Sequence, residues 1–180
     1  MLLNNLPILS ILIWTPIIGG VWALIAGDRQ EQTVKYFSLA VSIITFIFAV
    51  ILYCQFDPSY AGMQFMEESD WVRAFDIKYH LGVDGIALPL IMLTSFTTIL
   101  VILAAWEVIE KHISYYMCSF LILTGLMNGV FLALDAILFY VFWEAMLIPM
   151  FLIIGIWGGP NRVYATIKFF LYTFLGSVFM

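Results

Sequence analysis

The feature that most constrains this chain is a repeated pattern of apolar stretches, each about 20 residues long, which is the length of helix that crosses a bilayer. Charged residues gather in the segments between the stretches. The chain is 64% hydrophobic and only 11% charged, which is too apolar for a soluble domain. The sequence therefore predicts an all-α, polytopic bundle of transmembrane helices. The predicted spans are 6–26, 36–56, 86–106, 115–134 and 136–157.

The first and the last predicted helices differ in how much of each lies within residues 1–180. Residues 1–27 hold no charged side chain, so the basic segment of a signal peptide is missing and a retained first helix is expected. A sixth helix is predicted at 164–180, but only twelve residues follow Lys168. Twelve helical residues cover ~18 Å, little more than half of the bilayer core. We expect residues 1–180 to form the N-terminal portion of one longer membrane domain, either as a fragment or as a natural truncation.

A β-hairpin outside the membrane is predicted for the polar segment 57–84. Residues 75–81 alternate apolar and polar side chains, the period of a half-buried strand. Residues 63–67 form the expected partner strand, with a polar turn around 68–70. An irregular loop is the alternative.

Basic residues predict the orientation of the chain in the membrane. Loops on the cytoplasmic side of bacterial membrane proteins are richer in Lys and Arg. One side of the predicted bundle holds Arg29, Lys35, Lys111, Arg162 and Lys168, and the other holds only Arg73 and Lys78. The first side is therefore expected to be cytoplasmic. The N-terminus and the hairpin would then be periplasmic in a bacterial inner membrane, with the mitochondrial inner membrane as the alternative location.

Glu144 is the strongest candidate for a functional residue, because it is an acid in the middle of the predicted span 136–157. Placing a charged carboxylate at that depth costs ~2.5–3.5 kcal/mol on insertion scales. Such residues usually face a protein interior or water and carry function. Two interpretations remain open. Glu144 either takes up and releases a proton, or stays protonated and joins neighbouring helices through a hydrogen bond.

Two further residues are possible supports for Glu144. Pro149 lacks an N–H, so it leaves the carbonyl of Ala145 without its helical donor, beside Glu144. An ordered water could bridge the two, although a proline that serves only helix packing is an equal alternative. Lys168 either extends its ammonium to the cytoplasmic interface or leads protons inward.

The sequence offers no sign of a metal site, a cofactor site or nucleic-acid binding. Cys54 and Cys118 each lie in an apolar run, where thiols behave as small hydrophobes. His80 and His112 have no further ligand at metal-binding spacing. Flavin, nucleotide and iron–sulfur signatures are missing, so no redox centre is expected in this chain.

Several segments resemble one known family. The run Phe142–Met150, FWEAMLIPM, is similar to subunit M of the bacterial proton-pumping NADH:quinone oxidoreductase, complex I, and to its mitochondrial counterpart, subunit 4. Residues 79–86, 131–135 and 165–170 also resemble this family. The combination of Trp143-Glu144 with Leu-x-Pro-Met separates subunit M from its sister subunits better than any single motif.

The resemblance implies an antiporter-like subunit of the membrane arm, part of a translocase in which electron transfer from NADH to quinone drives proton pumping. It implies that Glu144 is the key carboxylate and pairs with a lysine of a later helix, which this chain lacks. NADH, FMN, iron–sulfur clusters and quinone would bind other subunits. The implied partners are the other membrane-arm subunits, including sister antiporter-like subunits, and membrane lipid.

Two other functions remain open from the sequence. A subunit of a multi-subunit cation/proton antiporter would share the fold and Glu144. The sequence does not distinguish protons from sodium ions as the translocated ion. A structural membrane subunit would use Glu144 only to join helices. A later helix carrying a midplane lysine would favour a transporter.

Overall fold

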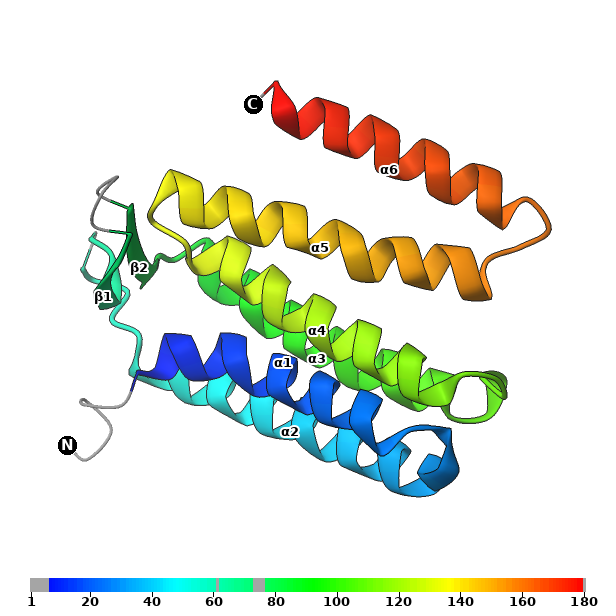
Figure 1. Cartoon of the computed structure of the whole chain (residues 1–180). Coiled ribbons are helices and arrows are strands. Elements are labelled where there is room, and N and C mark those ends of the chain that lie inside the picture. The colour runs from blue at the N-terminus through cyan, green and yellow to red at the C-terminus, as the bar shows by residue number, and fades with distance from the viewer. Residues whose placement is uncertain (1–6, 61, 73–76, 180) are drawn as a thin grey trace.

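The computed structural model describes residues 7–60, 62–72 and 77–179 and has helices packed side by side with a hairpin at one end (Figure 1). The elements are α1 (Ile8–Ala26), the short η1 (Asp28–Gln30), α2 (Glu31–Gln55), β1 (Gln64–Val72), β2 (Ile77–Val83), α3 (Ala87–Val108), α4 (Ile113–Leu132), α5 (Ala136–Trp157) and α6 (Arg162–Val178). This architecture confirms the predicted fold class, an all-α bundle with a small extramembrane hairpin.

A helix overlaps each of the predicted spans. Length and hydropathy suit several of the described helices to crossing a membrane, namely α1, α3, α4, α5, and α2 together with η1. The largest difference is at α2, which begins at Glu31 rather than at residue 36. Its charged first turns stay helical because Lys35 turns inward and its Nζ donates a hydrogen bond of 2.6 Å to the carbonyl of Trp106 on α3.

The closest helix pair in the bundle joins α1 and α4. A Cβ added to Gly125 of α4 would lie 2.5 Å from the backbone oxygen of Ile13 on α1. At the same interface the side-chain amide of Asn128 donates a hydrogen bond of 3.2 Å to the carbonyl of Leu12, 116 residues away. Small residues let membrane helices approach in this way, and interhelical hydrogen bonds then fix their register.

The hairpin pairs β1 and β2 antiparallel, with a longer first strand than the sequence predicts. The turn expected at residues 68–70 is wrong, because Glu68 pairs with His80 and Asp70 pairs with Lys78 inside the sheet. A 2.7 Å salt bridge from Lys78 to Glu68 compensates for the polarity of this strand and lowers the pKa of the Glu68 carboxyl. Residues 73–76, which include the predicted start of the second strand, lie outside the described part of the chain.

One carboxylate and one backbone hydrogen bond join the hairpin to the helical part of the chain. Glu67 of β1 accepts hydrogen bonds from the backbone N–H groups of Leu9 (2.8 Å) and Ser10 (3.1 Å) at the start of α1. A helix N-terminus favours negative charge there, since its first N–H groups have no helical partner. The backbone N–H of Leu134 donates to the carbonyl of His80 (2.9 Å), which ties β2 to the segment between α4 and α5.

Asp135 sets the start of α5 directly after α4. Its carboxylate accepts the backbone N–H groups of Leu138 (3.0 Å) and Ile137 (2.8 Å), and these bonds hold the pKa of Asp135 below its ordinary value. The short connection makes α4 and α5 antiparallel neighbours.

Candidate functional site

Glu144 lies near the middle of α5, where it is partly buried. Eight residues separate it from Ala136 at the start of the helix, a rise of ~12 Å. Two residues earlier, the buried ring of Phe142 rests on α4 at Gly129, where an added Cβ would lie 2.8 Å from the ring. The close contact at Gly129 fixes the rotation of α5 and leaves Glu144 able to reach α6.

On α6, Ser177 contacts the carboxylate directly. The Ser177 hydroxyl donates to Oε1 of Glu144 and also lies 2.9 Å from the carbonyl oxygen of Phe174. Only 6% of Ser177 is exposed. Sequence reasoning missed this residue, because 33 positions separate it from Glu144 and a serine in an apolar helix carries no signal of its own. A polar residue on the helix predicted to follow Glu144 was the available clue.

Helices α5 and α6 pack against each other in antiparallel directions. Thr166, near the start of α6, lies beside Gly155 near the end of α5, at 3.7 Å from the position of an added Cβ. Between this contact and the Glu144–Ser177 contact, the rings of Phe151 and Phe170 meet edge to face with centroids 5.7 Å apart. The carboxylate of Glu144 therefore lies at the end of the α5–α6 interface opposite Thr166, with aromatic rings between them.

Of the two possible supporting residues, Pro149 lies nearer to Glu144. It is buried within α5, five residues after Glu144, and its ring leaves the Ala145 carbonyl without a helical donor. Lys168 is exposed on α6, where its Nζ lies 5.7 Å and 5.9 Å from the ring centroids of Tyr164 and Tyr172. Lys168 precedes Ser177 by nine residues, or ~13 Å along the helix, so the structure does not bring it to Glu144.

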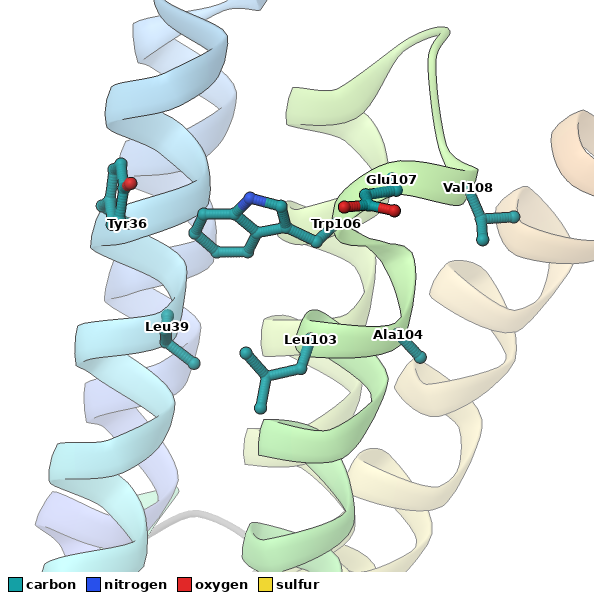
Figure 2. Close-up of a pocket in the computed structure, with 7 residues that line it drawn as sticks. All are labelled: Tyr36, Leu39, Leu103, Ala104, Trp106, Glu107 and Val108. Atoms are coloured by element: carbon teal, nitrogen blue, oxygen red, sulfur yellow. The ribbon is translucent and has the colours of Figure 1, made fainter.

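A surface hollow of ≈ 460 Å³ lies elsewhere, at the end of the bundle opposite the hairpin. Figure 2 shows the Trp106 ring of α3 reaching toward Tyr36 of α2, and the ring centroids are 5.1 Å apart. Glu107 lies at its edge. This hollow is formed by α2 and α3, whereas Glu144 lies at the α5–α6 interface, so the two are separate.

Within residues 7–60, 62–72 and 77–179, no group of three or more His, Cys, Asp or Glu side chains is placed to hold a metal ion. Cys54 is exposed and Cys118 is buried, and both thiols are free.

Comparison with known proteins places these features in a family. Residues 9–134 match the family model described as the amino terminus of NADH-ubiquinone oxidoreductase chain 4. The chain belongs to this family. Residues 133–180, which include Glu144 and Ser177, match the model described as NADH:quinone oxidoreductase/Mrp antiporter, TM. The resemblance seen in the sequence is thereby confirmed.

Individual relatives cover nearly the whole chain. It is 48% identical over 177 residues to NADH-quinone oxidoreductase subunit M of Rhodobacter capsulatus, covering 96% of this chain and 34% of that protein. It is 42% identical to NADH-ubiquinone oxidoreductase chain 4 of Arabidopsis thaliana, covering 96% of this chain and 35% of the relative. The chain thus spans about a third of the length of these curated relatives.

A solved structure has the same fold. A chain of respiratory complex I from Thermus thermophilus with bound NADH superposes with a TM-score of 0.79 at 24% sequence identity. The match covers 94% of this chain and 33% of that one. The bundle described above therefore has the fold of about a third of a chain in that assembly.

Proposed function

We propose that this chain is the N-terminal part of a proton-translocating membrane-arm subunit of an NADH:quinone oxidoreductase, and that Glu144 takes up and releases the proton. The observation that carries the proposal is a carboxylate halfway along a membrane-spanning helix of a chain from this family. The electron-transfer groups, which are NADH, FMN, iron–sulfur clusters and quinone, are assigned to other subunits. Those subunits and membrane lipid are the partners.

The surroundings of Glu144 support proton transfer over a purely structural role. A protonated glutamate that only joins helices is best served by partners for both carboxyl oxygens, because an unmade bond inside the bilayer is costly. In the described part of the chain, Ser177 bonds one oxygen, Oε1. The other oxygen, Oε2, remains available to a water or to a cation from outside these residues. Pro149 contributes by leaving the nearby Ala145 carbonyl open to a water.

A tagged form of the subunit tests its assignment to the complex. An affinity tag at the N-terminus, used on gently solubilised membranes of the source organism, should purify an assembly that oxidises NADH and reduces quinone. An assembly without NADH oxidation that restores sodium–proton or potassium–proton exchange to vesicles would instead support the antiporter alternative. A mock purification from untagged membranes is the control for both results.

The proposed orientation places the hairpin on the periplasmic side and the connection between α5 and α6 in the cytoplasm. The two regions lie at opposite ends of the bundle in Figure 1. The basic residues Arg29, Lys111 and Arg162 lie at the end opposite the hairpin, which supports this choice.

Cysteine labelling tests this orientation. A background without Cys54 and Cys118 is needed, because the Cys54 thiol is exposed and would react. In that background, a membrane-impermeant maleimide added to intact cells should modify Ser69→Cys and spare Asn161→Cys until the membrane is opened. The reverse pattern would invert the orientation and the direction of the proposed proton path.

A further inference from the structure

We infer that Ser177 is a positioning residue for proton transfer, and that its hydroxyl exchanges hydrogen-bond partners as Glu144 gains and loses its proton. This inference rests on the proposed function of Glu144 and adds a second residue to that site. It concerns a side chain of α6 that the sequence pattern did not single out.

The geometry gives the Ser177 oxygen two neighbours. One is Oε1 of Glu144, on the adjacent helix, and the other is the carbonyl oxygen of Phe174, 2.9 Å away on its own helix. A hydroxyl has one hydrogen to donate and two lone pairs to accept with. The hydroxyl of Ser177 can therefore donate to only one of these two oxygens at a time.

The protonation state of Glu144 decides which oxygen receives the hydrogen. When Glu144 is ionised, the Ser177 O–H donates to Oε1, and a hydrogen bond to a charged acceptor is the stronger choice. When Glu144 is protonated, its own O–H donates to the Ser177 oxygen, and the Ser177 hydrogen turns to the Phe174 carbonyl. In both states the Ser177 hydroxyl and Oε1 of Glu144 are hydrogen-bonded to each other. The two states differ by the rotation of one hydroxyl, with no movement of a helix.

This exchange suits a site with few other polar groups. The neighbouring α4 carries no charged residue, and Lys168 of α6 is displaced by ~13 Å along its helix. The Ser177 side chain is almost completely buried, so bulk water does not compete for its hydroxyl. Without Ser177, the ionised and the protonated carboxyl would each lose the partner that this chain supplies.

The neighbouring hydroxyl of Thr173 provides a matched control. Thr173 lies one turn earlier on α6, and its hydroxyl donates 2.8 Å to the carbonyl of Phe169. Thr173→Ala therefore removes a hydroxyl from the same helix, and the structure gives that hydroxyl no contact with Glu144. Ser177→Thr keeps a hydroxyl at the proposed position.

The test is infrared difference spectroscopy, together with proton uptake, on the assembled complex in native membranes. The carbonyl band of protonated Glu144 is first identified as the band that Glu144→Gln removes. In Ser177→Ala this band should move to higher frequency, because the carboxyl O–H has lost its acceptor. The part of NADH-driven proton uptake that passes through this subunit should fall about fivefold, as expected for one lost hydrogen bond. Ser177→Thr and Thr173→Ala should match the unaltered protein in both readouts.

An unmoved band in Ser177→Ala, or an equal shift in Thr173→Ala, would overturn the inference. If the alanine variant does not assemble, Ser177→Cys replaces it, since a thiol is a weak donor and should give a smaller shift in the same direction. A failure of the proposed function has a different signature, which is normal pumping in Glu144→Gln. Loss of pumping in Glu144→Gln with an unmoved band in Ser177→Ala would reject the role of Ser177 alone.

Discussion

Gly125→Ala should reduce the amount of assembled subunit in the membrane several-fold. The added Cβ would lie 2.5 Å from the backbone oxygen of Ile13 and 2.5 Å from the Ile17 side chain, so α1 and α4 must move apart. Overpacking of this kind costs ~1–3 kcal/mol, and backbone cannot rotate out of the way as a side chain can. The measurement is the abundance of the subunit in the solubilised complex and the temperature at which the complex dissociates.

Gly155→Ala is the matched control on α5. There the nearest atoms to the added Cβ belong to Thr166, at 3.7 Å and 3.8 Å, which is ordinary contact. Alanine is also the better helix former by ~1 kcal/mol, so this variant should assemble as well as the unaltered protein. An equal loss of assembled subunit in Gly125→Ala and Gly155→Ala would contradict the role of the α1–α4 contact. It would show that assembly is sensitive to any glycine substitution in these helices.

The helices of this fold could be predicted because bilayer thickness alone sets their length. A run such as residues 136–157 must be helical to satisfy its backbone inside lipid, whatever its neighbours are. Helix neighbours could not be predicted in the same way. Helices that are apolar on every face give no sign of which face is buried, so the contact between Asn128 and Leu12 emerged only from the structure.

The hairpin illustrates a second limit of sequence reasoning. Alternation of apolar and polar residues indicated the strand Ile77–Val83, although its burial rises along the strand, from half-buried residues 77–80 to buried residues 81–83. The polar residues 68–70 looked like a turn because Asp and, to a lesser degree, Glu are depleted in strands. Cross-strand pairing with Lys78 offsets that cost, and pairing partners are not visible until the register is known.

Of the two residues that form the candidate site, Glu144 could be singled out from the sequence and Ser177 could not. Glu144 stood out because a carboxylate inside a membrane span is energetically costly whatever surrounds it. Ser177 did not, because a serine is tolerated in many membrane helices. Lys168 was predicted either to extend to the cytoplasmic interface or to lead protons inward, and it lies ~13 Å along α6 from Ser177.

Glu144→Gln should abolish NADH-driven proton pumping by this subunit while the complex remains assembled. Glutamine keeps the shape and much of the hydrogen bonding of a protonated glutamate, but it cannot exchange a proton. Oxidation of NADH by coupled membranes should slow as well, because the proposed function ties proton transfer to quinone reduction. Glu144→Asp should retain part of the pumping, since it keeps the carboxyl on a shorter side chain.

Glu107→Gln serves as the matched control. Glu107 is exposed near the end of α3, at the edge of the hollow in Figure 2, and away from the α5–α6 interface. The same chemical change there should leave both assembly and pumping unaltered. If Glu144 only joined helices, its glutamine variant should behave like this control.

The most direct test of the central claim is the ratio of protons translocated to NADH oxidised, recorded simultaneously in inverted membrane vesicles that carry assembled Glu144→Gln complex. If Glu144 carries a proton, the ratio falls below that of the unaltered complex by the share of protons that this subunit moves, and NADH oxidation slows. A glutamine variant with an unchanged ratio and an unchanged rate would show that Glu144 carries no proton.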